Sequence, residues 1–151
     1  MITQHRKPCG ECPFARNVEP GTLGGSPAAV YVGQTEGPFF LACHCNPGYA
    51  ENRGSLAQPQ CAGAAIYRAN LGLAERMPAM LLHLEPDPAR VFTSHQEFLQ
   101  HHKQWTAEEA AEYLRKYPPQ ELLQQEFRIA QERLQQHHPD VRVKLVPKAT
   151  S

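Results

Sequence analysis

The second half of the chain has the clearest alternation of apolar and polar positions, and this pattern predicts helices. Residues 94–97 (Ser-His-Gln-Glu) and 106–109 (Thr-Ala-Glu-Glu) each have the form of a capping box. In such a box a hydroxyl oxygen accepts a hydrogen bond from the amide three residues on, and the glutamate accepts one in return. We therefore expect one helix from residue 94 to about 102 and a second from 106 to about 117.

A longer helix is predicted after the Pro118-Pro119 pair, over residues 120–137. Its apolar residues recur at spacings that place them on one face of a helix. This stripe consists of Leu123, Phe127, Ala130 and Leu134. Pro139 ends the helix, and the alternation of apolar and basic residues over 141–145 predicts a short edge strand.

The first half combines loops rich in glycine and proline with shorter elements. Ser26-Pro27 predicts the N-cap and first residue of a helix toward Gln34, although the β-branched and aromatic residues 30–32 also suit a strand. The apolar run 39–42 predicts a buried strand that leads into Cys43. Two further segments follow, namely a polar loop over 46–59 and a helix over 62–71.

The distribution of residue types divides the chain near residue 85. All five cysteines and nine of the ten glycines precede residue 64. With 151 residues, the chain is long enough for one domain with a modest hydrophobic core. We therefore predict a single domain, 1–151, with a cysteine-bearing core at 7–72 and a helical C-terminal half at 85–146 that ends in the short strand.

Charge and hydropathy argue against two classes of partner. Lysine plus arginine and aspartate plus glutamate both number 15, so the chain lacks the basic bias of proteins that bind nucleic acid through phosphates. It also lacks the run of about 18 apolar residues that a membrane helix needs. No apolar run follows the charged N-terminus as in a signal peptide. We expect a cytoplasmic protein with no membrane partner and reduced thiols.

The cysteines carry the strongest chemical signal. Cys9-Gly10-Glu11-Cys12 is a C-x-x-C pair in a loop, and the two-residue gap allows both sulfurs to face one metal. Cys43 ends the predicted strand, and Cys61 begins a predicted helix, whose first amides stabilise a thiolate. The pattern predicts one metal centre with Cys9, Cys12, Cys43 and Cys61 as ligands.

Two other interpretations of the cysteines are weaker. A thioredoxin-like dithiol requires a C-x-x-C pair that follows a strand and opens a helix, whereas here Pro13 follows the pair and no strand precedes it. Buried structural cysteines would account for Cys45 or Cys61 individually. They do not account for a pair in a polar loop.

Other residues near these cysteines could support the centre. In a strand-like Cys43-His44-Cys45 the two sulfurs share one face, so Cys45 is the spare cysteine, although it could replace Cys43 as a ligand. His44 could be a ligand or an acid–base group, but a hydrogen-bond donor to a ligand sulfur is the favoured role. Arg16 and Arg68 could lie just outside the ligands, as His44 could, and neutralise a negatively charged thiolate centre. Alternatively, they could simply be solvated.

The sequence slightly favours a [4Fe–4S] cluster over Zn²⁺. Iron–sulfur clusters accept widely separated single cysteines, often with proline directly after one ligand, as Pro13 follows Cys12. Structural zinc prefers two cysteine pairs, but zinc is common and could also use His44. With either metal, we predict an α+β fold in which a small, loop-rich, metal-centred N-terminal half with short strands packs against several C-terminal helices.

The order of the motifs resembles a family of small uncharacterised proteins from bacterial and phage genomes. The shared pattern is C-x-x-C-P-[FW]-x-R, then Cys-His, then Cys-Ala-Gly, and it covers residues 7–72. The matching residues are Cys9, Cys12, Pro13, Phe14, Arg16, Cys43, His44, Cys61, Ala62 and Gly63. The family usually has tryptophan in place of Phe14, and Cys45 is an addition. The resemblance implies a shared metal-binding core and no particular activity.

Three functions are compatible with these features. The favoured one is a non-enzymatic module, stabilised by its metal, that binds a protein or nucleic-acid partner of unknown identity. The alternatives are an iron–sulfur enzyme acting on nucleic acid and a redox sensor. We assign no catalytic residues, because the sequence has no phosphate-binding glycine loop, nucleophile elbow or paired catalytic carboxylates.

Overall fold

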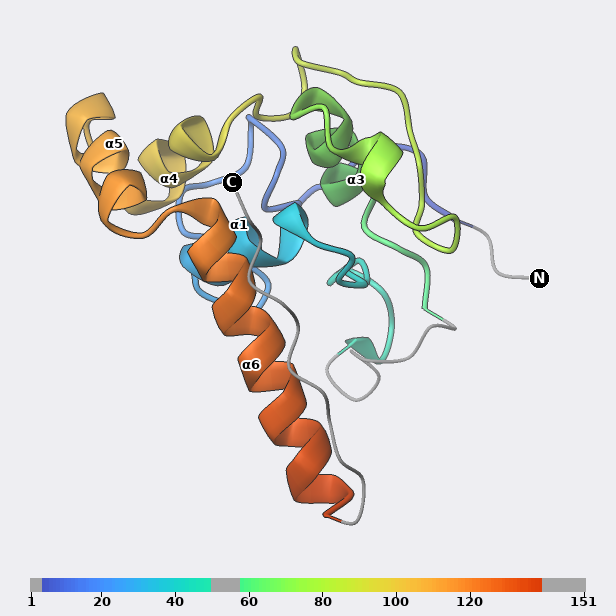
Figure 1. Ribbon diagram of the computed structural model, residues 1–151. Coiled ribbons are helices and arrows are strands. Elements are labelled where there is room, and N and C mark those ends of the chain that lie inside the picture. Colours follow the sequence, from blue (N-terminus) through green and yellow to red (C-terminus); the bar gives the residue numbers. More distant parts are fainter. Residues whose placement is uncertain (1–3, 50–57, 140–151) are drawn as a thin grey trace.

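The computed structural model describes residues 4–49 and 58–139, and the described part is mainly helical (Figure 1). None of the helices in this part is long and apolar enough to cross a membrane. The elements are α1 (Ala28–Glu36), α3 (Ala62–Asn70), the 3-10 helix η1 (Ala74–Arg76), α4 (His95–Lys103), α5 (Ala107–Lys116) and α6 (Pro119–His137).

The predicted α+β class is wrong, because β-structure in residues 4–49 and 58–139 consists of isolated bridges. At the expected strand 39–42, a single bridge joins Ala42 to Gln60. The Phe39 carbonyl instead accepts a hydrogen bond of 2.9 Å from the Arg68 guanidinium. A side chain therefore takes a main-chain acceptor that a neighbouring strand would otherwise use. The predicted strand over 141–145 lies outside the described residues.

The predicted helices of the second half are confirmed, with one difference at a cap. Thr106 and Glu109 form a complete capping box at the start of α5. At α4 the Ser94 hydroxyl accepts from the Glu97 amide, as predicted. The Glu97 carboxylate, however, accepts from the amide of Thr93, at 2.8 Å, and so satisfies a donor one residue earlier.

In the first half, α1 and α3 are also confirmed. Residues 30–32 are helical, so the alternative strand is excluded. Helix α1 begins one residue later than expected: Pro27 is the N-cap residue and has no side-chain capping bond. Carbonyl groups at the C-terminal end of α1 accept hydrogen bonds from another helix. Arg68 of α3 donates to the carbonyls of Gln34, Thr35 and Gly37.

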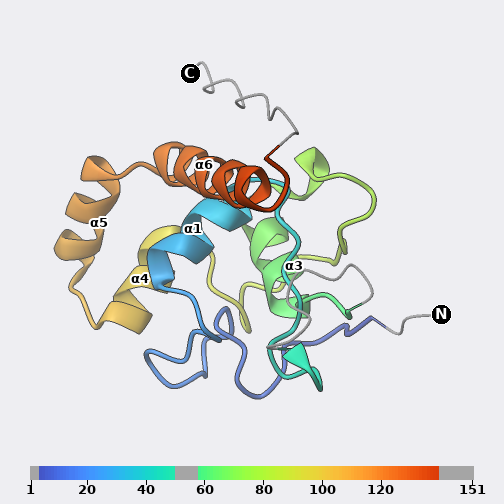
Figure 2. The same ribbon diagram turned by 90° about the horizontal axis from the view of Figure 1, so that it is seen from below.

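Helix α6 packs across α1 (Figure 2), and its C-terminal part extends beyond the other described helices (Figure 1). Its buried residues lie near its start: Leu122, Leu123 and Glu126. Within the predicted apolar stripe, Leu123 near the start of α6 is buried, whereas Leu134 is 43% exposed. Apolar spacing correctly places residues on one face but does not say how far along a helix its partner extends.

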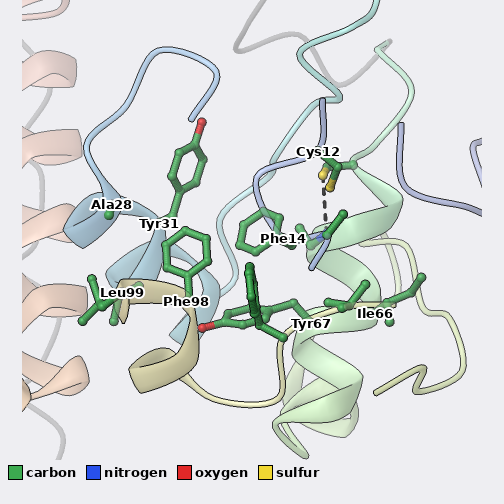
Figure 3. Packing of buried hydrophobic residues seen from close by; sticks show 14 of the residues in the cluster. Cys12, Phe14, Ala28, Tyr31, Ile66, Tyr67, Phe98 and Leu99 are labelled. Carbon is green, nitrogen blue, oxygen red and sulfur yellow. Dashed lines mark hydrogen bonds between the residues drawn. The ribbon is translucent and has the colours of Figure 1, made fainter. Parts of the chain in front are cut away.

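The core is a cluster of aromatic rings from four parts of the chain. Phe14 comes from the loop that follows Cys12. Its ring centroid lies 5.0 Å from that of Tyr67 in α3, 5.4 Å from that of Phe98 in α4 and 5.6 Å from that of Tyr31 in α1. Figure 3 shows Phe14 between these rings and next to Cys12. The loop that carries the C-x-x-C pair is therefore anchored in the hydrophobic core by the second residue after the pair.

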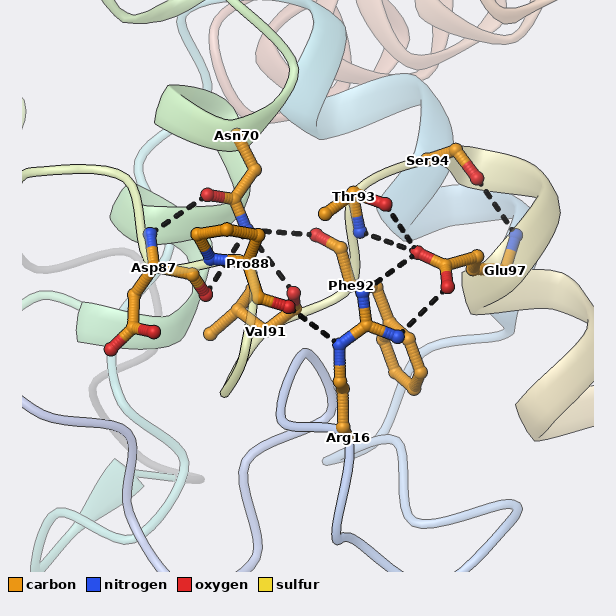
Figure 4. A network of polar contacts seen from close by, with 9 residues as sticks. All are labelled: Arg16, Asn70, Asp87, Pro88, Val91, Phe92, Thr93, Ser94 and Glu97. Atoms are coloured by element: carbon orange, nitrogen blue, oxygen red, sulfur yellow. Dashed lines mark hydrogen bonds and ion pairs between the residues drawn. The ribbon is translucent and has the colours of Figure 1, made fainter.

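A polar network joins this loop to the segment before α4 (Figure 4). The Arg16 guanidinium pairs with both carboxylate oxygens of Glu97, at 2.8 and 3.1 Å. Its Nε donates to the Pro88 carbonyl at 2.8 Å, and the group lies over the Phe92 ring. The hydrogen bonds from Arg16, followed by those from Thr93, lower the pKa of Glu97 to about 2.

The first prediction concerns Gly33, where α1 approaches α6. A Cβ on Gly33 would lie 2.7 Å from the Leu122 carbonyl oxygen, a backbone atom that cannot move aside alone. Alanine is the better helix former, so an isolated helix would gain stability from Gly33→Ala. In the folded protein we expect a loss of about 1–3 kcal/mol, because the helices must separate. Urea unfolding checks this, and an unchanged or raised midpoint would contradict the close approach.

The second prediction concerns acid stability. The folded-state pKa of Glu97 is about 2, against an ordinary value of 4.5, so its contribution is complete above about pH 4.5 and disappears as the pH falls toward 2. Because the carboxyl side chain is 36% exposed and screened by water, we expect Glu97→Gln to cost roughly 1 kcal/mol at neutral pH. Wild type and variant should then converge on acidification. Glu112→Gln, in an exposed pair with Arg115, is the control and should change little at any pH.

Candidate metal centre

Three cysteine sulfurs meet at one edge of the molecule. The sulfurs of Cys9, Cys43 and Cys45 all lie within 4.8 Å of one another, close enough to hold a metal ion. The Cys45 thiol lies 3.0 Å from the Cys9 sulfur. Cys43 is buried, Cys9 is half-buried and Cys45 is exposed, so the group spans the boundary between the interior and solvent.

The other two cysteines form a buried pair beside this group. Cys12 and Cys61 are 1% and 7% exposed, and each thiol influences the ionisation of the other. The neighbouring Cys61 thiol, together with burial, raises the pKa of Cys12 well above its ordinary value. Figure 3 shows Cys12 at the N-terminal end of α3.

Cys61 is the N-cap residue of α3, and its sulfur accepts a hydrogen bond from the Ala64 amide at 3.4 Å. The neighbouring Cys12 thiol, the amides of Ala64 and Gly63, and the charge of Arg68 lower the pKa of Cys61 despite its burial. Cys61 therefore has the environment of a thiolate. This agrees with the role predicted from its position at a helix start.

Electrostatic interactions connect the buried pair, Cys12 and Cys61, to the group formed by Cys9, Cys43 and Cys45. Burial raises the pKa of Cys43, and a charge on Cys61 raises it further. The pKa of Cys12 is likewise raised in part by a charge on Cys9. The four predicted ligands are thus near enough to influence one another's ionisation, and Cys45 joins them through Cys9.

Backbone contacts explain why these segments meet. The Cys61 amide donates to the Leu41 carbonyl at 2.8 Å, and the Cys43 amide donates to the Pro59 carbonyl at 3.1 Å, so Cys43 and Cys61 are held side by side. On the other side, His102 of α4 lies 2.6 Å from the Pro13 carbonyl and fixes the loop directly after Cys12.

The predicted supporting residues are differently placed. His44 lies 3.8 Å from the Cys45 sulfur through Nε2, and burial lowers its pKa. Arg68 is 5% exposed, and its charge favours a Cys61 thiolate, although its hydrogen bonds go to carbonyl groups. The Arg16 guanidinium is bound to Glu97 and to the Pro88 carbonyl.

Two residues at the site were given no structural role by the sequence analysis. A Cβ on Gly63 would lie 2.1 Å from the Cys12 sulfur, so the glycine of the Cys-Ala-Gly motif is needed for the loop to pack on α3. The Glu11 carboxylate lies within 4.8 Å of the Cys45 sulfur and 3.9 Å from Nε2 of His44. A glycine two residues after the cysteine that begins the predicted helix could have indicated the close contact at Gly63. Nothing in the sequence distinguished Glu11.

The third prediction tests the contact between the loop and α3. Gly63→Ala should displace Cys12 and cost roughly 2–3 kcal/mol of unfolding free energy, because two packed segments must move apart. The buried thiols should also react faster with a thiol reagent such as Ellman's reagent. Gly10→Ala is the matched control, since a Cβ there has no atom within 4 Å, and it should change neither quantity. Equal effects of both variants would argue against the close approach.

Comparison with known proteins does not identify the site. No protein-family model matches the chain, and neither the curated proteins nor the solved structures include a significant match. The argument about function therefore depends on the geometry of these residues.

Proposed function

We propose that this protein binds one metal ion through Cys9, Cys12, Cys43 and Cys61, and that it acts as a non-enzymatic interaction module whose fold the metal stabilises. The observation that supports the proposal is that Cys9 and Cys43, from separate segments, have sulfurs within 4.8 Å of each other. The buried pair of Cys12 and Cys61 lies beside them. Cys9 and Cys12 belong to the N-terminal loop, Cys43 follows a separate extended segment, and Cys61 caps α3. An ion bound to all four would cross-link these segments, and its binding energy would contribute directly to folding.

The spacing of the Cys9 and Cys43 sulfurs supports a single metal ion and favours zinc over a cluster. Four thiolates around Zn²⁺ at about 2.3 Å in a tetrahedron lie roughly 3.8 Å from one another. Of the proposed ligands, Cys9 and Cys43 have sulfurs within 4.8 Å of each other, which is a similar spacing. In a [4Fe–4S] cluster each cysteine binds a different iron of the cubane, which separates the sulfurs more widely. Zn²⁺ is therefore our proposed metal, in place of the slight preference for a cluster drawn from the sequence.

The burial of the ligands supports a structural role for the ion. Structural zinc sites are closed, with four protein ligands and no position for substrate. Cys12, Cys43 and Cys61 are all buried, and the first and last are part of the aromatic core cluster. An ion at such a place would act mainly on stability.

A redox sensor is the second candidate, and the position of Cys45 favours it. Its thiol is exposed and adjacent to the half-buried Cys9 thiol. A peroxide that reached this pair would take the two thiol hydrogens, give water, and leave a Cys9–Cys45 disulfide. Cys9 would then be lost as a ligand, so oxidation would release the metal.

The fourth prediction concerns metal content. Protein purified without oxygen should hold at least one zinc per chain, and chelation should lower its melting temperature. Cys12→Ser and Cys61→Ser should lose the zinc and much of the stability. Cys45→Ser is the matched control, because it removes a sulfur from the same cluster but not a proposed ligand, and it should keep this zinc. Wild-type protein without metal would contradict the proposal, while about four iron with sulfide would replace zinc by a cluster.

A further inference from the structure

A second set of donor atoms lies on the solvent side of the cysteines. One carboxylate oxygen of Glu11, a ring nitrogen of His44 and the Cys45 sulfur all lie within 4.8 Å of one another. The Nε2 atom of His44 is 3.8 Å from the Cys45 sulfur and 3.9 Å from Oε2 of Glu11. These are the separations expected of atoms that surround one ion at about 2.0–2.3 Å.

This set is distinct from the four cysteines proposed above. None of its three side chains belongs to that group, and it uses the one cysteine that a four-ligand centre leaves over. Glu11 and Cys45 are exposed, whereas the side chain of His44 is 14% exposed. An ion here would thus be open to solvent on one side and supported by a nearly buried imidazole on the other.

Neighbouring residues hold two of the three donors in place. The Cys45 sulfur lies 3.0 Å from the Cys9 sulfur, so the loop that supplies the carboxylate of Glu11 also contacts the thiol. Gly24 lies against the imidazole: a Cβ at that position would be 3.0 Å from Cγ of His44. The backbone therefore approaches the ring closely and limits its movement, which reduces the cost of ordering it on binding.

We propose that Glu11, His44 and Cys45 bind a second divalent cation of the zinc class. Thiolate sulfur and imidazole nitrogen select zinc over magnesium or calcium, which prefer oxygen ligands, and a carboxylate oxygen is the third common zinc donor. Three protein ligands leave a coordination position for water or an external ligand. The second site differs in this respect from the closed four-cysteine centre, and it should exchange its ion more readily.

The inference rests on the proposed function in one respect, since it takes Cys45 to be free of the four-cysteine centre. The test therefore counts both ions in the same full-length protein. Wild type is equilibrated at a fixed free Zn²⁺ concentration and assayed for zinc beside Glu11→Gln and His44→Gln. Glu75→Gln and His83→Gln replace exposed residues outside both groups and serve as controls.

We expect about two zinc per chain in the wild type and controls, and about one in Glu11→Gln and His44→Gln. With Co²⁺ as the probe, the second equivalent should give its own thiolate charge-transfer band, and Cys45→Ser should abolish that band while keeping the first. About one ion in every protein would overturn the second site and leave the first intact. Loss of a single wild-type ion in His44→Gln would also overturn it, because His44 would then belong to the first centre. A wild type without zinc would contradict both proposals.

Discussion

The contact between the Cys12 sulfur and the first turn of α3 is the constraint on which the rest of the structure depends. Gly63 permits it, because any side chain there would occupy the place of the sulfur. The same contact brings Cys12 close enough to Cys61 to affect its ionisation, and it places Phe14, two residues later, at the centre of the aromatic core. One close approach therefore organises both the cysteines and the hydrophobic packing.

Helix α3 connects this contact to the opposite side of the molecule. At its start Cys61 lies with the other cysteines, and seven residues later the buried Arg68 donates to carbonyls at the end of α1 and to Phe39. Helix α1 in turn packs against α6 through Gly33. Because interiors are closely packed and transmit strain, a metal that fixes the start of α3 would also stabilise helices that contact no ligand.

The cysteines differ in burial in a way that separates two kinds of chemistry. Cys12, Cys43 and Cys61 are buried, Cys9 is half-buried and Cys45 is exposed beside His44 and Glu11. Inner sulfurs are protected from reagents and suit a structural ion, whereas the outer donors are open to exchange, to oxidation and to external ligands. A structural centre and a responsive surface could therefore share the same small region.

The sequence alone determined the helices and the group of residues that carries the chemistry, because these depend on local signals: capping residues at 94 and 106, prolines that end segments, and the C-x-x-C pair. It also indicated that Cys61 opens a helix, where the Cys12 thiol and then the amides of the first turn lower its pKa. Only the tertiary structure decided that the run 39–42 is not a strand, since a distant arginine takes its carbonyl, and that the outer half of α6 stays exposed. It alone placed Glu11 and His44 beside Cys45. Such pairings depend on how segments far apart in the chain pack, and local sequence patterns contain no record of that packing.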